Sequence, residues 1–421
     1  MPANGLIVIA RVKPGCETRL RETLNCIGND IQGKRLNPDK PEPHIAFPNS
    51  RTLHFARIAL FDDPEEPARK RLLLVTDYDG SWDKHVAELI DLTTDPDAIW
   101  GCCEGYTGCE QFPDFIRTHM VEPQAYYIAL SDYTLAQIRQ LIRLRLELDP
   151  RLFNLIDASI LGKFLRVGED LARFPLAAVD LLGILLQHGP VNTLLAARRV
   201  NATLDRVWWI WLFNRLTFNG HPPPRHRYSG VPMQDTEADK PQVKAERGVQ
   251  QEAWDGTPPE DLISQNQLTL LTNVRPEQVQ RLQAVLAIID LFGRRLAVPG
   301  SLVGISTIHT VRWALLEKGR HLLMASNYDG TWENYIDEFA ELILSGLDAI
   351  WDSSYTYPEA GAQDVEALKY FLRCHQVPAN VFYSAYPDAT LLNLVDALEV
   401  ERQMVAQPAP AQRPASEPAT S

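Results

Sequence analysis

Two histidine–arginine pairs occur at the same spacing in two separate parts of this 421-residue chain. His54 stands three residues before Arg57, and His309 stands three residues before Arg312 in a matching apolar segment. A histidine of this kind can donate a proton, accept one or bind iron. An arginine can hold an anion through two parallel hydrogen bonds. Both segments are therefore candidates for binding a cofactor or a charged substrate.

A second repeated motif follows each pair. Asp79-Gly80-Ser81-Trp82 and Asp329-Gly330-Thr331-Trp332 each lie between a predicted strand and a predicted helix. Asp, Ser and Thr at the start of a helix accept backbone N–H bonds, and Gly suits the turn. A carboxylate at the end of a strand can also act as a general acid or base. We expect capping to be the main role, with catalysis by Asp79 or Asp329 as the alternative.

A third repeated feature is a histidine at the end of a predicted short helix. His119 and His375 each follow an arginine by two positions. The helix dipole favours cationic side chains at this end, so a structural role accounts for both histidines. A role for His375 as an iron ligand stays open.

The alternation of side chains along a strand predicts where the first pairs point. His54 shares a face with Ala56, and His309 shares one with Val311, so both histidines are expected under the helices. There each is either a core histidine with a hydrogen-bond partner or a ligand to haem iron. The arginines Arg57 and Arg312 are expected on the opposite face. Each is either half of an ion pair between two sheets or a clamp for an anion.

These motifs belong to an internal repeat, which the sequence shows without an alignment. Each copy has the element order strand, helix, strand, strand, helix, strand, and a last helix closes it. Four blocks recur in the same order along the chain: residues 53–60 match 308–315, 72–82 match 322–332, 97–100 match 348–351, and 115–121 match 371–377.

This order predicts an α+β fold with two tandem ferredoxin-like βαββαβ units, antiparallel sheets and a helical insert between the units. Helices cover one face of each sheet, so we expect the two open faces to cover each other. The expected segments are a first repeat (1–150), a helical insert (151–220), a Pro-rich polar linker (221–261), a second repeat (262–404) and a disordered tail (405–421).

The insert carries an unusual aromatic run, Trp208, Trp209, Trp211 and Phe213. Three tryptophans at this spacing cannot all face one core. One interpretation is a helix wedged between the two units. The other is a contact helix for a membrane surface, a lipid, a protein partner or a second copy of the chain.

Composition excludes some classes of function. The formal net charge of −13 argues against a nucleic-acid partner, because nucleic-acid binding needs clustered positive charge. The first residues resemble a strand rather than a signal peptide, and cysteine is scarce. We therefore expect a cytoplasmic protein, peripheral to the membrane if the tryptophan run binds lipid. Cys102, Cys103 and Cys109 lack a matching histidine pair, so we expect no metal beyond a haem iron.

The duplicated ferredoxin-like arrangement resembles the dye-decolourising peroxidase and chlorite dismutase superfamily of dimeric α+β barrel proteins. Asp329-Gly330 and Asp79-Gly80 look like the end of the GxxDG motif of those peroxidases. The first glycine of that motif is Ser326 or Thr76 here, so the motif matches in part. The resemblance implies that haem sits between a sheet and its helices.

Carried over to this chain, the resemblance implies a haem-binding, peroxidase-like oxidoreductase. His309, His375 or His54 would be the axial ligand of the iron. Arg312 or Arg57 would stand on the distal side, and Asp329 or Asp79 would assist peroxide cleavage. The alternative is a non-catalytic scaffold that contacts lipid or a partner through the tryptophan run. The sequence leaves open whether the protein is an enzyme.

Overall fold

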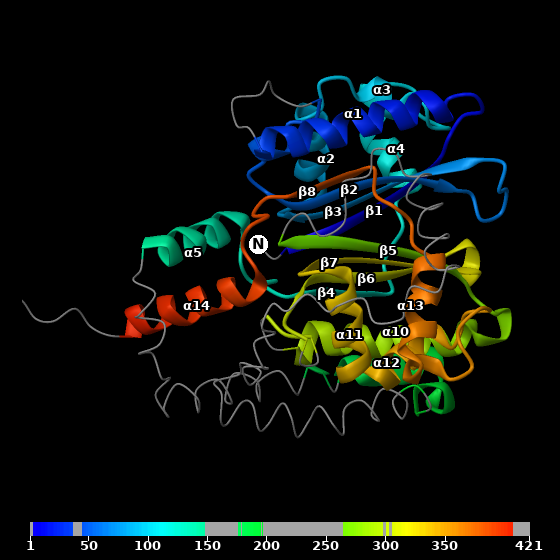
Figure 1. The fold of residues 1–421 in the computed structure, drawn as a ribbon. Helices are drawn as coiled ribbons and strands as arrows, with labels where there is room; N and C mark the ends of the chain where they lie inside the picture. The colour runs from blue at the N-terminus through cyan, green and yellow to red at the C-terminus, as the bar shows by residue number, and fades with distance from the viewer. Residues whose placement is uncertain are drawn as a thin grey trace, which may run out of the picture.

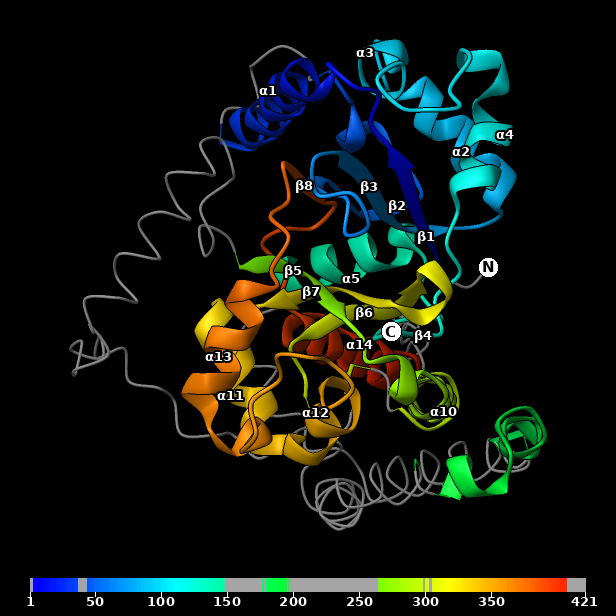
Figure 2. The same cartoon turned by 90° about the vertical axis from the view of Figure 1, so that its right-hand side faces the viewer.

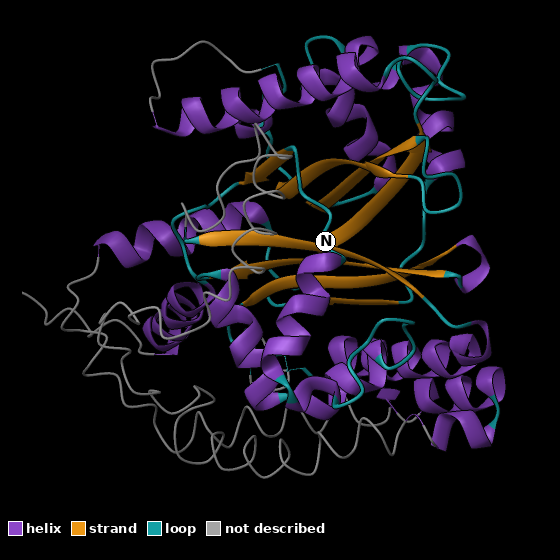
Figure 3. Cartoon of the chain, turned by 45° about the vertical axis from the view of Figure 1, so that its right-hand side comes forward, coloured by secondary structure: helices purple, strands orange, loops and turns teal. Residues whose placement is uncertain are grey.

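Two antiparallel four-stranded sheets lie face to face at the centre of the molecule, and helices cover the outer face of each sheet (Figures 1 and 3). The structure is a computed structural model. It describes residues 3–36, 44–147, 176–196 without 178 and 195, 264–297, 300–302 and 305–406. The predicted α+β class, with helices between the two sheet-forming regions, is confirmed.

The strands follow the predicted apolar runs closely. The first sheet has the order β1-β3-β2-β8 and the second the order β4-β6-β7-β5. The strands are β1 (Ala3–Arg11), β2 (Leu53–Asp62), β3 (Lys70–Asp79), β4 (Ala125–Ile128), β5 (Gln265–Asn273), β6 (Ile308–Leu316), β7 (His321–Asp329) and β8 (Val381–Ser384).

The helices form two outer layers and one pair at the end of the sheets. The first layer, over the first sheet, consists of α1 (Glu17–Leu36), α2 (Trp82–Asp91), α3 (Pro96–Trp100) and α4 (Phe112–His119). The second layer consists of α10 (Val279–Leu291), α11 (Trp332–Leu342), α12 (Leu344–Trp351) and α13 (Val365–Cys374). The remaining pair, α5 (Leu135–Glu147) and α14 (Leu391–Ala406), pack against each other beside the sheets (Figures 1 and 2).

Strand alternation explains why the two sheets face each other. Along β2, Ala56 and Ile58 enter the core under the first helix layer. Ala59 and Phe61 enter a separate core together with Ala314 of β6. Each sheet is thus apolar on both faces, and each inner face removes the other from water. The expected shielding of one sheet by the other is confirmed.

The fourth strands are exchanged between the two units, which the sequence did not predict. After α4 the chain bonds β1, where Val121 N donates to Ile7 O, and then crosses to pair β4 with β6 of the second sheet. The second unit repeats this path: Val377 N donates to Thr269 O, and β8 pairs with β2 of the first sheet. Each sheet therefore contains three strands of one unit and one strand of the other.

Part of the predicted insert lies within the described residues. Residues 179–188 and 190–194 are helical, Ile184 is buried in the core of the second unit, and Asp180 pairs with Arg295 at 2.9 Å. The aromatic run Trp208, Trp209, Trp211 and Phe213 lies outside the described residues, as do the linker and residues 407–421 of the tail. Among the described helices, none combines the length and apolar character that a membrane span requires.

Candidate functional site

Arg312 crosses from the second sheet into the first, as its position on β6 predicted. Its guanidinium pairs with the Asp77 carboxylate and donates to the Tyr126 hydroxyl at 3.0 Å and to Thr76 O at 3.1 Å. A Cβ atom on Gly5 would lie 2.6 Å from Arg312 Nη1, so only glycine leaves room for this arrangement. The expected ion pair between the sheets is present here.

Arg57 makes the reciprocal crossing but meets neutral groups. The residue that corresponds to Asp77 in the repeat is Asn327, whose amide oxygen accepts from Arg57. Arg57 also donates to Thr269 Oγ1 at 2.8 Å and to Ser326 O at 2.6 Å. Burial lowers the pKa of Arg57 to about 9, with Asp77 opposing this shift and Arg312 adding to it. The two buried guanidiniums thus share one carboxylate, that of Asp77, in the layer between the sheets.

His54 and His309 occupy places that simple alternation did not predict. The strand register shifts between Leu53 and Phe55, and again between Ile308 and Thr310, so each histidine falls at a bulge. Both imidazoles line a cavity with Asp77 that strands of both sheets and helices α5 and α14 enclose, instead of lying under the two outer helix layers. The expectation that these histidines share the face of Ala56 and Val311 is therefore wrong.

Each of these histidines is bonded to the aspartate of the nearby Asp-Gly motif. His54 Nε2 lies 2.9 Å from Asp79 Oδ1, and His309 Nε2 lies 2.7 Å from Asp329 Oδ1. The second oxygen of each carboxylate accepts a helix N–H, from Leu135 at 2.7 Å for Asp79 and from Leu391 at 2.6 Å for Asp329. Both aspartates are thus committed to structural bonds at the starts of α5 and α14.

The capping role is therefore correct in kind but differs in the helix served. Asp79 and Asp329 bond the helices that follow the exchanged strands, not α2 and α11, which follow the motif directly. Thr331 caps α11 by accepting from Asn334 N at 3.2 Å, whereas Ser81 makes no such bond to α2. Exchange of the strands brings the two distant helix starts to these carboxylates.

The cavity beside these histidines is small and its polar groups are engaged. It has an empty volume of about 320 Å³ and also contains Tyr386, whose hydroxyl lies 3.3 Å from His54 Nδ1. Burial, with Asp77, Asp79 and Asp329 nearby, raises the pKa of Tyr386 well above its ordinary value. A neutral phenol bonded to an imidazole stabilises the interior here, and it leaves little space for a substrate.

His375 lies elsewhere, at the end of α13 as predicted. Its Nδ1 lies 2.7 Å from Phe371 O, and its Nε2 lies 3.1 Å from Thr356 Oγ1. His119 has the matching bond to Phe115 O at 2.8 Å. Because both ring nitrogens of His375 have protein partners, the structure favours a structural role over a role as an iron ligand.

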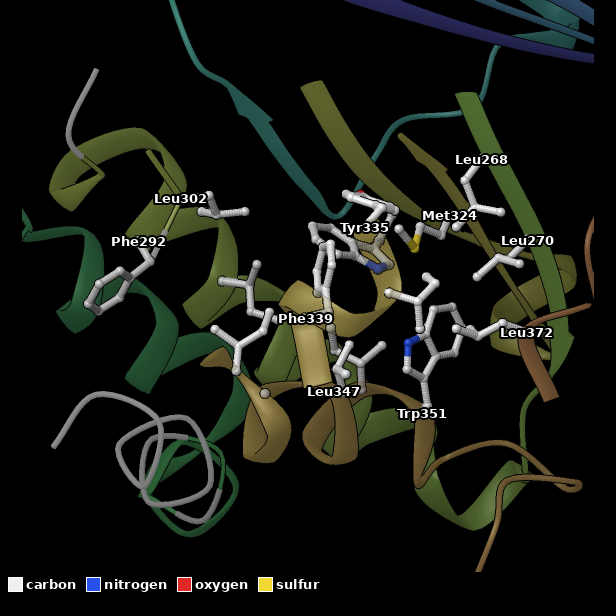
Figure 4. Close-up of a pocket in the computed structure, with 16 residues that line it drawn as sticks. Leu268, Leu270, Phe292, Leu302, Met324, Tyr335, Phe339, Leu347, Trp351 and Leu372 are labelled. Atoms are coloured by element: carbon white, nitrogen blue, oxygen red, sulfur yellow. The ribbon is translucent and has the colours of Figure 1, made fainter. Parts of the chain in front are cut away.

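A larger cavity lies between the second sheet and helices α10, α11 and α12 (Figure 4). Its empty volume is about 890 Å³, which includes its opening to solvent. Leu268, Leu270 and Met324 project into it from the strands, and Phe339, Leu347 and Trp351 project from the helices (Figure 4). The remaining lining residues are Ile289, Phe292, Leu302, Trp313, Tyr335, Ile336, Ile343, Gly346, Ile350 and Leu372.

No charged side chain belongs to this described lining, and its one hydroxyl is already bonded. Tyr335 is buried, its hydroxyl lies 2.6 Å from Ser326 Oγ, and burial raises its pKa above the ordinary value. In the first unit His85 takes the place of Tyr335 and bonds Thr76 Oγ1 at 2.8 Å. Burial lowers the pKa of His85 to about 3, so this imidazole is neutral at pH 7.

The residues present do not fit haem at the place where the resemblance puts it. The large cavity has the implied position between sheet and helices, but His309, His375 and His54 are all absent from its lining. No cation among the described lining residues could receive a propionate. Elsewhere in the described part of the chain, no group of three or more His, Cys, Asp or Glu side chains could hold a metal ion.

Sequence reasoning did not find this cavity. Its residues have the types and spacing of ordinary core positions, and the volume they leave depends on three-dimensional packing. Several lining residues differ in size or shape from their repeat partners: Trp313 replaces Ile58, Met324 replaces Leu74 and Tyr335 replaces His85. Such changes between the copies were the available signal that the two cores are filled differently.

Comparison with known proteins adds no relative. No family model matches the chain, and no curated protein and no solved structure is significantly similar to it.

Proposed function

We propose that this protein binds a small, uncharged, apolar molecule in the cavity between the second sheet and helices α10, α11 and α12. The observation that carries the proposal is the lining, which is apolar over strands and helices alike. Ligand cavities in proteins are lined mainly by apolar and aromatic side chains, as this cavity is.

Physical chemistry limits the ligand to uncharged molecules. A charged group would lose its hydration in this cavity and find no opposite charge among the described lining residues. An apolar ligand that buries about 200 Å² of its own surface would gain roughly 5 kcal/mol by transfer from water. It would also restore dispersion contacts that the lining side chains lack around an empty space. The costs of association reduce this gain, so we expect a Kd of about 0.2 mM or weaker.

The proposal keeps the non-catalytic alternative predicted from the sequence, but it places the binding site in the cavity instead of at the tryptophan run. The tryptophan run was the expected contact for lipid or a partner, and that expectation remains a prediction for residues outside the described part. The haem-dependent oxidoreductase also remains a prediction. It has no support from the histidine positions, and titration with haemin tests it directly. A Soret band that shifts on binding to this protein would favour it.

A neutral fluorescent probe, N-phenyl-1-naphthylamine, tests the proposal with the full chain. We expect saturable binding, with a change in the emission of tryptophans such as Trp313 and Trp351, which line the cavity. Ile343, half-buried in the lining, offers a site to block the space. Ile343→Trp should abolish binding, whereas Leu344→Trp is the matched control, because Leu344 packs on the same core without lining the cavity.

Two outcomes would refute the proposal. One is the absence of saturable binding to a wild-type protein that unfolds cooperatively. The other is equal binding by both tryptophan variants, which would place the probe outside this cavity.

A further inference from the structure

Two cysteine thiols meet where α1 begins, on the first unit and far from the apolar cavity. Cys16 directly precedes α1, and the backbone holds Cys102 close by, because Lys13 N donates to Cys102 O at 2.8 Å and Cys16 N donates to Lys13 O at 3.1 Å. Burial raises the pKa of Cys102, and the nearby Cys16 thiol adds to this shift. The Cys16 side chain packs against the core that contains Cys102, so the two thiols are neighbours.

The two thiols differ in access. Cys102 is fully buried, whereas Cys16 is half-buried and reaches the surface. A reagent from solvent therefore meets Cys16 first, and Cys102 stands behind it. Attack by a buried second thiol on an oxidised first thiol is the usual route to a protein disulfide.

The fold does not require sulfur at these positions, as the second unit shows. There Arg275 N donates to Ser353 O at 2.9 Å and Gln278 N donates to Arg275 O at 2.9 Å, which repeats the backbone pattern around Cys102 and Cys16. Gln278 and Ser353 thus replace the two cysteines. The thiol pair is a property of the first unit alone.

We propose that Cys16 and Cys102 form a reversible disulfide when the protein meets a hydroperoxide. The Cys16 thiolate attacks one peroxide oxygen, and the O–O bond breaks to give Cys16 sulfenic acid. The leaving oxygen takes a proton from solvent and departs as an alcohol, or as water from hydrogen peroxide. The Cys102 sulfur then attacks the Cys16 sulfur. The S–O bond breaks, and the leaving hydroxide takes the Cys102 proton as water. The sulfurs lose two electrons, and the peroxide gains them.

The test uses the full chain, reduced and then treated with hydrogen peroxide. Trypsin places Cys16 between cleavage sites at Arg11 and Arg19, because Pro14 protects the bond after Lys13. A disulfide then joins this short peptide to the one that contains Cys102. We expect the joined peptide, two hydrogens lighter than the sum of its parts, and its loss after reduction by a thiol. We also expect the oxidised protein to melt at a temperature higher by roughly 5 °C, because the bond closes a long loop.

Serine variants keep the test interpretable, and two of them copy residues of the second unit, Ser353 and Ser354. Cys102→Ser should abolish the joined peptide and the melting shift, and Cys16→Ser should do the same. Cys103→Ser should retain both, and its counterpart Ser354 shows that the fold accepts a hydroxyl there. The exposed Cys26 is the internal standard for a thiol without a partner.

The proposal fails if wild-type Cys16 gains two or three oxygens as fast as Cys26 while no joined peptide forms. It also fails if the joined peptide persists in Cys102→Ser, which would make another cysteine the partner.

Discussion

Exchanging Asp77 with Asn327 should move the single carboxylate between the sheets from one arginine to the other. Asp77→Asn alone leaves Arg312 and Arg57 buried without a direct carboxylate partner. Removing one partner of a buried ion pair typically costs about 3–5 kcal/mol, because the other charge stays uncompensated. We therefore expect the free energy of unfolding to fall by this amount.

Asn327→Asp alone should also destabilise the protein, although it gives Arg57 a carboxylate. Asn327 Nδ2 donates to Asp77 Oδ2 at 3.0 Å and to Thr310 Oγ1 at 2.8 Å, and the substitution removes the donor. Two carboxylates at this separation repel by roughly 5 kcal/mol at an effective dielectric constant of 20. The new contact with Arg57 offsets part of this, so we expect a net loss of about 2–3 kcal/mol.

The double variant Asp77→Asn/Asn327→Asp restores one carboxylate, one amide and two guanidiniums. Its introduced amide can donate to its introduced carboxylate, which reverses the direction of the bond that Asn327 makes to Asp77. We expect the double variant to lie within about 2 kcal/mol of wild type, where additive effects would give a loss of roughly 5–8 kcal/mol. Tyr126 bonds Asp77, and the position facing Arg57 on the exchanged strand is Phe382, which explains the residual loss.

Urea unfolding of the four proteins measures this coupling, with the midpoints compared at constant slope. Additive losses in the double variant would refute the reasoning, because the two arginines would then not share one charge.

Three further predictions concern other buried groups. His85→Tyr copies the second unit and removes an imidazole that burial keeps neutral. Between pH 6.5 and about 3 the unfolded wild-type chain binds a proton at His85 that the folded chain does not. As pH falls through this window, the wild type should therefore lose up to about 1.4 kcal/mol of unfolding free energy per pH unit relative to the variant. Parallel pH-dependent slopes in urea unfolding would contradict this. Gly5→Ala should cost about 1–3 kcal/mol by overpacking against Arg312, whereas Gly183→Ala, with open space around its Cβ, should be neutral or slightly stabilising in thermal unfolding. Asp329→Ala removes the partner of His309 and of a helix N–H and should lower the unfolding free energy by about 2–4 kcal/mol; an unchanged urea midpoint would rule out that double role.

Local rules predicted the features that depend on one strand at a time. Alternation along β2 and β6 correctly placed Arg57 and Arg312 between the sheets, because side chains on a regular strand alternate faces. The same rule misplaced His54 and His309, because each lies at a bulge that interrupts the alternation, and periodicity alone does not reveal a bulge.

Features that depend on several segments were beyond such rules. A four-residue strand such as β4 has the same alternation whichever sheet it joins, so nothing in its residues indicates the exchange. The hydrogen bonds from the starts of α5 and α14 to Asp79 and Asp329 follow from that exchange, so the sequence did not predict them either. The apolar cavity depends on the volume left after packing. Strand patterns therefore identified the sheets, while the contacts that define the candidate sites needed three dimensions.

The exchange of β4 and β8 makes the two repeats depend on each other for their structure. If the chain were divided within the insert, each fragment would keep three strands of a sheet and one short strand without its pairing partner. The inner face of each sheet, including the arginine that the other unit now buries, would be exposed to water. Neither fragment would then be a domain in the physical sense, because its hydrogen bonds and its charge compensation reside in the other. A single copy of the unit would regain these hydrogen bonds and this charge compensation by forming a two-fold symmetric, strand-swapped dimer with a second identical copy. Covalent linkage of the copies lets their sequences differ, so Asp77 can face Asn327, and Tyr335 can line a cavity where the first unit has His85.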